Sequence, residues 1–427
     1  MRRLSSEKVI LGLYVLYIVN QILSASQFTN LESVNVLLTY SRYALFVLIT
    51  LFAILHVCKK NASKTKFFLI VALLAAGLMN MLFVDGGIAL LLDVIIVFSY
   101  KKKSLYKIFR VTFWTILLTN LFVVLCCRMG IIEDVVSVRW LGNQTGKFFA
   151  GRYDRHTYGF LVQNQIPNAF LILYLIMIVL YKGKLTFIQD AIVLVIDYFL
   201  FSIFGARISF VLTIVAVLIH ATSLIIDKYR KRKNSGRRYI APIVFVVSGL
   251  LSFSACLAYG GGYGFTRTLD LIFNNRLRLG SEAIRYYGIK LIGSGKTSGT
   301  YMGALADNTV DNGYILLFIQ YGLIIGIFVL ALWIYVSVLC NKSRYCTGAL
   351  IIFALLNIVD SHLTSYMAIP FMCILLNQND PLILSDVVLL KKRRRLFRFS
   401  VRRGRNEGMA ATHSTIATLA GETRRIQ

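Results

Sequence analysis

Basic side chains gather in two long connections between apolar segments of this chain of 427 residues. The connections span 128–158 and 260–311, whereas the other connections are short. Guanidinium and ammonium groups bind phosphates and carboxylates, so these residues predict an anionic partner. The cations are Arg128, Arg139, Lys147, Arg152, Arg155, Arg267, Arg276, Arg278, Arg285, Lys290 and Lys296.

Acid–base candidates stand at the ends of apolar runs. Asp311 and Asn312 stand at the start of the run 312–339. A carboxylate there can accept a proton from a substrate hydroxyl or cap a helix, and the sequence leaves both roles open. Asp360-Ser361-His362 contains the residue types of a hydrolytic triad, but adjacency in sequence is not triad geometry. We interpret this run as polar groups at a helix junction, with His362 a candidate substrate contact. Asn164 lies among amides at the start of another run and predicts a polar cavity wall.

Other patterns are weaker. GSGKT (293–297) lacks the first glycine of a phosphate-binding loop, because Lys290 stands at that position. The seven cysteines show no CxxC spacing and no accompanying histidine cluster, so no metal site is predicted. Asp190 and Asp197 are seven residues apart and share one helix face pointing into the bundle. Hydrogen bonding between packed helices is the commoner use of such residues, and proton coupling is the alternative.

The elements that must position these residues follow from composition. Hydrophobic residues make up 57% and charged residues 15%, with a mean hydropathy of +0.69. Soluble domains have about 45–50% apolar and about 25% charged residues. The chain is therefore predicted to be an all-α, polytopic integral membrane protein, and the net charge of +28 is not attributed to nucleic acid.

Runs of about 20 apolar residues mark the membrane spans. About twelve are predicted, near 9–25, 36–58, 67–84, 87–99, 108–127, 159–181, 185–204, 206–226, 240–259, 312–339, 347–360 and 363–377. With the N-terminus in the cytoplasm, most of the 47 Lys and Arg fall in cytoplasmic connections, as the positive-inside rule requires. Both termini are then cytoplasmic, and the two long connections face outward.

The predicted domain organisation is simple. Residues 1–390 form a single transmembrane domain, and residues 391–427 form a basic, disordered cytoplasmic tail resting on anionic lipid. Cations on the outer face run against the usual bias and favour an anionic outer ligand. The alternative is that long loops cross the membrane whatever their charge.

Four segments together resemble the Wzy-type polysaccharide polymerases and the wider O-antigen polymerase/ligase family. They are RYDRHTYGFLVQNQIPN (152–168), FGARISFVLTI (204–214), FNNRLRLGSEAIRYYGIKLIGSG (273–295) and DNTVDNGYILLFIQYGLIIGIFVL (307–330). The resemblance implies a GT-C-like, metal-independent membrane glycosyltransferase without a cofactor. Such an enzyme transfers a growing glycan from polyprenyl pyrophosphate to the next lipid-linked repeat unit, making capsule, exopolysaccharide or O-antigen. It would act at the outer face of the bacterial cytoplasmic membrane, with membrane lipids, a flippase and a chain-length regulator as partners.

The resemblance also implies roles for single residues. Arg207 matches the arginine that opens a helix in the family, and Arg276 or Arg278 matches the loop arginine; both are expected to hold pyrophosphate. Asp311 stands where ligase-like members carry histidine before the asparagine, here Asn312, and is the candidate base. The candidate donor- and sugar-binding residues are Arg152, Arg155, His156, Asn164, Asn312 and His362.

Three alternatives remain open at this stage. An O-antigen-type ligase would share the chemistry and differ in its acceptor. A flippase or transporter for lipid-linked saccharides would use Asp190 and Asp197 as a coupling pair within the membrane. A non-catalytic scaffold would leave the outward arginines without a task.

Overall fold

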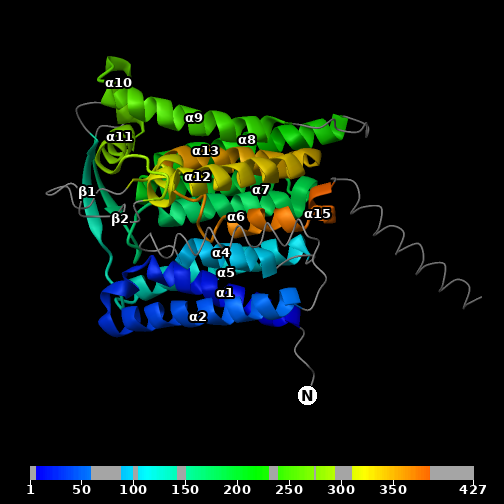
Figure 1. Ribbon diagram of the computed structural model, residues 1–427. Coiled ribbons are helices and arrows are strands. Elements are labelled where there is room, and N and C mark those ends of the chain that lie inside the picture. The colour runs from blue at the N-terminus through cyan, green and yellow to red at the C-terminus, as the bar shows by residue number, and fades with distance from the viewer. Residues whose placement is uncertain are drawn as a thin grey trace, which may run out of the picture.

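The protein is a bundle of roughly parallel helices with small elements gathered at one end (Figure 1). The computed structural model describes residues 6–58, 88–99, 104–141, 151–229, 239–273, 276–293 and 310–384. The predicted span 67–84 and the predicted tail 391–427 lie outside these residues. A buried apolar core runs through the bundle and includes Tyr14, Phe109, Tyr174, Trp333 and Phe353.

The N-terminal layer contains α1 (Ser6–Ser24), the 3-10 turn η1 (Gln27–Asn30), α2 (Glu32–Cys58), α4 (Ile88–Ser99) and α5 (Leu105–Arg128). Helix α1 packs against both α2 and α5. Helix α5 in turn packs against α6, which joins this layer to the rest of the bundle.

The central layer contains α6 (Gln165–Tyr181), η3 (Lys182–Lys184), α7 (Phe187–Phe204), α8 (Arg207–Tyr229) and α9 (Ile240–Gly260). Helix α6 begins at Gln165 rather than near residue 159, because residues 157–164 form turns. It is the most enclosed of the long apolar helices, with most of its length buried, and it contacts α5, α7, α8 and α13. Its position makes it the axis on which the neighbouring helices pack.

The C-terminal part contains α10 (Gly264–Ile272), α11 (Arg276–Tyr287), α12 (Gly313–Leu339), η5 (Cys340–Lys342), α13 (Arg344–Val359), α14 (Ile369–Met372), η6 (Cys373–Leu376) and α15 (Pro381–Leu384). The predicted span 363–377 is wrong as a single helix. Leu363 and Met367 lie in a stretch without regular secondary structure and are buried. The segment is apolar because other parts of the protein pack over it.

Long apolar helices indicate a membrane protein. Within the described residues, the seven helices α2, α5, α6, α7, α8, α9 and α12 are long and apolar enough to cross a membrane, and α1 and α13 are shorter apolar helices. Large apolar side chains stand exposed around the bundle, among them Leu48, Leu121, Ile196, Leu250 and Ile327. A lipid environment accounts for so much exposed apolar surface.

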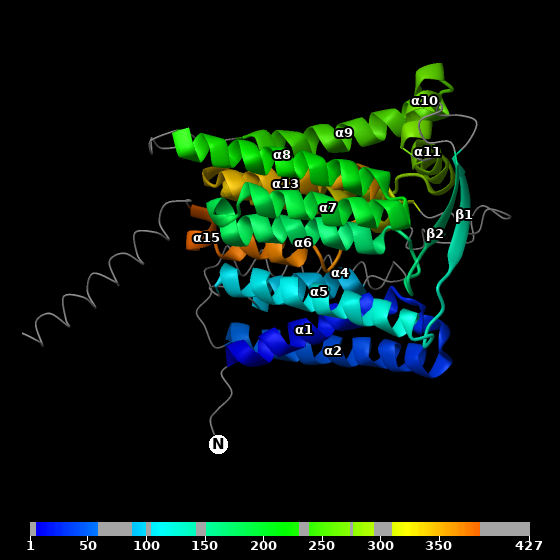
Figure 2. The same ribbon diagram turned by 180° about the vertical axis from the view of Figure 1, so that it is seen from behind.

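The prediction of a purely helical chain is wrong in the first long connection. Strands β1 (Val136–Leu141) and β2 (Gly151–His156) form an antiparallel hairpin in which Val136 lies opposite His156 and Leu141 opposite Gly151. Alternating branched and aromatic side chains in VSVRWL favour a strand. The hairpin stands at the same end of the bundle as α10 and α11 (Figure 2); this is called the hairpin end.

The opposite end of the bundle carries η3, η5 and the start of α13. Its connections are rich in cations, with Lys182, Lys184, Lys342 and Arg344, and it is called the basic end. Helices α6, α8 and α12 begin at the hairpin end, and α13 ends there. The chain therefore brings segments far apart in sequence to one surface.

Helix α12 is interrupted at Gly322, whose φ of 82° and ψ of 172° are not helical. The N–H groups of Leu323 and Ile324 donate to the carbonyls of Lys290 (2.9 Å) and Leu291 (3.4 Å). A Cβ added to Gly293 would meet the Gln320 carbonyl oxygen at 1.9 Å. The end of the second long connection is thus docked, backbone to backbone, on the break in α12.

Candidate functional site at the hairpin end

An ion pair joins α11 to the residue before α12. Arg276 Nη2 lies 3.3 Å from Asp311 Oδ2, and Arg276 is only 6% exposed. The start of α11 is fixed by Asp270 of α10, whose Oδ1 accepts hydrogen bonds from the N–H groups of Leu277 and Arg278. The guanidinium is therefore presented from a helix whose first turn is held in place.

Asn312 is the N-cap of α12. Its Oδ1 accepts hydrogen bonds from the N–H groups of Tyr314 and Ile315, each at 3.1 Å, and the residue is 1% exposed. Capping by a short polar side chain satisfies helix donors that would otherwise lack partners. The cap predicted for the Asp311-Asn312 pair thus belongs to Asn312, and the carboxylate of Asp311 pairs with Arg276. Whether Asn312 also binds substrate stays a prediction.

His362 brings an imidazole into the same region. It is 6% exposed, and its Nε2 is buried without a hydrogen-bond partner among the described residues. Its distance of 3.7 Å from Asp360 Oδ1 exceeds a hydrogen bond. Burial lowers the pKa of His362, the neighbouring Asp360 raises it, and the positive charge of Arg276 lowers it. The net result is a lowered pKa, so the imidazole is neutral near pH 7.

Arg276 shares the unpaired character of His362. Its Nε is also buried without a hydrogen-bond partner in the described part of the chain. An unsatisfied buried donor or acceptor costs roughly 1–3 kcal/mol, and such atoms in native proteins mark a strained or functional position. Two of them in one electrostatically connected cluster define the candidate site.

Hydrogen bonds between helices hold this cluster together. Asn168 of α6 donates to Asp360 Oδ2 and accepts from Ser209 Oγ of α8 at 2.6 Å. The N–H of His362 donates to Asn357 Oδ1 at 2.8 Å. The ends of α6, α8 and α13 are therefore linked directly beneath His362. Arg207 begins α8 two residues before Ser209 and is half-buried.

Arg155 connects the hairpin to the helices. Its Nε donates to the carbonyl of Phe204 at 2.7 Å, and its Nη2 donates to Asn164 Oδ1 at 3.0 Å. Gly205 adopts a left-handed conformation (φ 63°) beside the Arg155 side chain. Arg155 and Asn164, predicted to bind substrate, thus contact each other and position β2 against the turn between α7 and α8. Their predicted contact with substrate remains a prediction.

The other predicted binding residues lie on α11 and on the hairpin. Arg278 Nη1 lies 3.9 Å from Glu282 Oε1 on the next turn of α11. His156 Nδ1 lies 2.7 Å from Asp134 Oδ2. Arg152 stands opposite Trp140 in the hairpin, and its side chain lies outside the described part.

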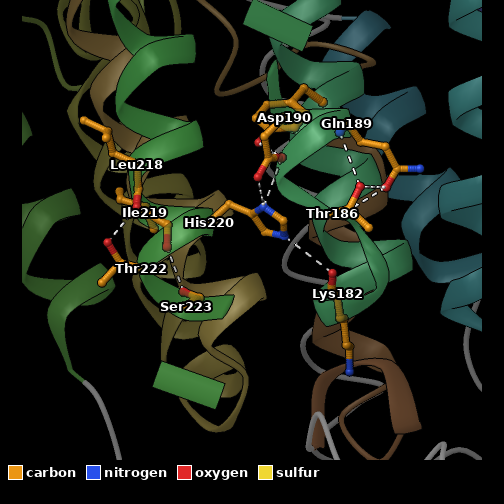
Figure 3. A network of polar contacts seen from close by, with 10 residues as sticks. Lys182, Thr186, Gln189, Asp190, Leu218, Ile219, His220, Thr222 and Ser223 are labelled. Atoms are coloured by element: carbon orange, nitrogen blue, oxygen red, sulfur yellow. Dashed lines mark hydrogen bonds and ion pairs between the residues drawn. The ribbon is translucent and has the colours of Figure 1, made fainter. Parts of the chain in front are cut away.

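A second polar network lies in the bundle interior towards the basic end (Figure 3). Asp190 and Asp197 are both buried, which confirms the shared inward face. Asp190 contacts His220 Nδ1 at 2.8 Å and Tyr174 Oη at 2.8 Å, and His220 Nε2 lies 3.4 Å from the carbonyl of Lys182. Asp197 instead lies beside Thr213, and its Oδ2 is buried without a hydrogen-bond partner among the described residues. The two carboxylates therefore face different residues of α8.

Comparison with protein-family models, curated proteins and solved structures finds no match to this chain. The geometry of the hairpin end is therefore the basis for assigning a function.

Proposed function

We propose that this protein is a membrane glycosyltransferase that polymerises lipid-linked oligosaccharide repeat units into a surface polysaccharide. One observation carries the proposal. Arg276, Asp311 and His362 come from three separate segments at the end of the bundle that the sequence predicts to face outward. Arg276 and His362 are buried, Asp311 is half-buried and pairs with Arg276, and the charge of Arg276 acts on His362. A cation, a carboxylate and a neutral imidazole are the groups that glycosyl transfer from a pyrophosphate requires.

The proposed reaction assigns each group one task. Arg276 stabilises the negative charge that develops on the pyrophosphate as the bond between the anomeric carbon and its oxygen breaks. A hydroxyl of the acceptor sugar forms the new bond to that carbon, and its proton passes to Nε2 of His362. Asp311 holds Arg276 in position, and Arg207 supplies a second cation. The polyprenyl pyrophosphate leaves as the anion.

The base proposed here differs from the one that the family resemblance implies. The resemblance predicts Asp311 as the base, whereas we propose His362. Its ion pair with Arg276 favours a positioning role, because a guanidinium stabilises the ionised carboxylate and makes it a weaker proton acceptor. His362 has a neutral ring and an unpartnered nitrogen, which favours it as the base.

The nearest competing functions are a ligase and a flippase. A ligase would use the same groups with a different acceptor. A flippase driven by protons would use Asp190 and Asp197 together, and the separate partners of these residues argue against that coupling.

A deletion strain tests the proposal. Cells that lack the protein should carry single lipid-linked repeat units on the outer face of the membrane and make no long chains. Enzymatic labelling of sugars in intact and in broken cells locates the repeat units, and gel analysis measures chain length. Repeat units confined to the inner face would contradict the proposal and favour a flippase. Long chains that remain attached to polyprenyl pyrophosphate would favour a ligase.

A further inference from the structure

A compact cluster of polar and aromatic side chains lies at the hairpin end, outside the Arg276 site. It consists of Arg128, Asp134, His156 and Tyr158, and is called the Tyr158 cluster. Asp134 organises it: Oδ1 accepts hydrogen bonds from the N–H groups of Thr157 (3.0 Å) and Tyr158 (2.8 Å), and Oδ2 faces His156 Nδ1 at 2.7 Å. One carboxylate therefore fixes both the turn and the imidazole.

The backbone of Tyr158 is strained. Its φ of 48° is in the left-handed region, which glycine adopts freely and a tyrosine adopts at a cost. The following Gly159 has a φ of 84°, and a Cβ there would meet Ile132 Cδ1 at 2.6 Å. Position 159 is thus a glycine because there is no space for a side chain. Position 158 is a tyrosine although glycine would be less strained there. Such strain is characteristic of functional positions.

The ring of Tyr158 is held on several sides. The Arg128 guanidinium carbon lies 4.7 Å from the ring centroid, and Arg128 Nη2 donates to the phenol oxygen at 3.2 Å. Phe204 meets the ring edge-on with centroids 5.4 Å apart, and the His156 ring is also 5.4 Å away. An ordered, half-buried aromatic ring is thus presented next to polar groups.

His156 offers a hydrogen-bond acceptor beside that ring. Its Nδ1 faces a carboxylate, which places the proton on Nδ1 and leaves Nε2 as an acceptor. Nε2 makes no hydrogen bond within the described residues, and the side chain is 38% exposed. Arg128 is exposed as well and provides donors. The cluster therefore combines an aromatic surface with a donor and an acceptor.

The charge of the cluster indicates which ligand fits. The guanidinium of Arg128 and the carboxylate of Asp134 offset each other, so the cluster has little net attraction for a phosphate. A sugar ring has an apolar C–H face that packs on an aromatic ring and hydroxyls that both donate and accept hydrogen bonds. We propose that the Tyr158 cluster is a saccharide-binding subsite, separate from the site of bond formation. This inference rests on the proposed function for its physiological ligand, the sugar residues of the repeat unit or growing glycan.

Binding to purified protein in detergent tests the subsite directly. The probes are oligosaccharides from partial acid hydrolysis of the surface polysaccharide, and inorganic pyrophosphate as an anionic comparison. Saturation-transfer NMR and titration calorimetry should detect the oligosaccharides binding to the unmodified protein. Tyr158→Gly should weaken oligosaccharide binding at least tenfold and leave pyrophosphate binding unchanged. Glycine relieves the backbone strain but loses the contacts of the ring with Arg128 and Phe204, so the melting temperature is measured for each variant and affinities are compared between folded proteins.

Matched variants separate the ring from its surroundings. Tyr158→Phe keeps the ring and should retain most of the affinity. His156→Asn keeps a donor for Asp134 and removes the Nε2 acceptor, and should weaken binding several-fold. Tyr263→Ala removes an exposed tyrosine from the other long connection and should change nothing. Absence of oligosaccharide binding in the unmodified protein, or unchanged affinity in both Tyr158→Gly and His156→Asn, would overturn the inference.

The outcomes also separate this inference from the proposed function. If the deletion strain still makes long chains while Tyr158-dependent oligosaccharide binding is measured, the proposed function fails and the subsite stands. If the deletion strain behaves as proposed while Tyr158→Gly and His156→Asn both bind oligosaccharides normally, the subsite fails and the polymerase stands.

Discussion

Asp311 holds the buried Arg276 guanidinium from the position directly before the N-cap of α12, with 3.3 Å between Oδ2 and Nη2. The ion pair joins the start of α11 to the start of α12. It therefore holds two parts of the second long connection together. The charge of Arg276 also acts on a second buried group, the neutral imidazole of His362.

Arg276→Ala should reduce glycosyl transfer by about 10²–10³, the cost of removing one preorganised donor that stabilises developing charge. Transfer is measured in membranes with purified lipid-linked repeat units, normalised to the amount of inserted protein. Arg285→Ala is the matched control, since Arg285 is an exposed arginine in the last turn of the same helix; its rate should stay within about twofold. Equal losses in both variants would remove Arg276 from the mechanism.

His362 predicts a specific pH dependence. Because burial lowers its pKa, the ring stays neutral to a pH below the ordinary value of about 6.5. Transfer should be constant above about pH 6.5 and fall only at lower pH. His362→Gln should lower the rate roughly 10²–10⁴-fold and abolish this acidic limb. A limb that persists in the variant would assign the titration to another group.

The same lowered pKa affects stability. As pH falls below about 6.5, the unfolded chain binds a proton that the folded imidazole does not, so the free energy of unfolding decreases. Thermal unfolding in detergent should show a smaller acid-induced loss of stability in His362→Gln than in the unmodified protein.

Asp311→Asn distinguishes a positioning residue from a base. The amide can still hydrogen-bond to the guanidinium but loses the charge, so we expect a loss of about tenfold with the acidic limb of the pH profile retained. Complete loss of transfer, with pyrophosphate still bound normally, would instead make Asp311 the base.

Gly293→Ala should detach the long connection from α12. A Cβ would lie 1.9 Å from the Gln320 carbonyl oxygen, and relieving such overlap typically costs about 1–3 kcal/mol or more. A lower melting temperature and faster proteolysis of the connection are the readouts. Gly264→Ala is the control, because nothing lies within 4 Å of its added Cβ. Unchanged stability in Gly293→Ala would contradict the docked arrangement.

His220→Ala tests the network towards the basic end. Removing one partner of a buried hydrogen bond leaves the other unsatisfied and costs roughly 1–3 kcal/mol, so stability should fall while each folded molecule keeps its transfer rate. Thr222→Ala on the exposed face of the same helix should change stability by less than about 0.5 kcal/mol. Loss of transfer at full stability would instead give this network a role in the reaction.

Hydropathy predicted most of the long helices, because a lipid-facing helix must be apolar along its length. It misread residues 363–377, because Leu363 and Met367 are covered by protein rather than lipid and burial alone does not distinguish a helix from irregular chain. The hairpin was missed although Val136, Val138 and Trp140 alternate with polar residues, since a strand of six residues is invisible to a scan for spans.

The sequence predicted several residues of the candidate site but not the contacts between them. Charge placement indicated that Arg276 and Asp311 would share one face of the membrane. Their ion pair and the nearby His362 depend on packing between distant segments, which no local pattern encodes. Asn168 belongs to the amides predicted to line a polar cavity, and its hydrogen bonds to Asp360 and Ser209 depend on contacts between helices that the sequence does not encode locally.

The break at Gly322 constrains the length of the segment between Arg276 and Gly293. The carbonyls of Lys290 and Leu291 accept hydrogen bonds from the first N–H groups of the second half of α12. Adding or removing a residue between Arg276 and Gly293 would shift these hydrogen bonds or move Arg276 away from Asp311. We therefore expect an insertion or deletion between Arg276 and Gly293 to cost either the ion pair with Asp311 or the docking on α12.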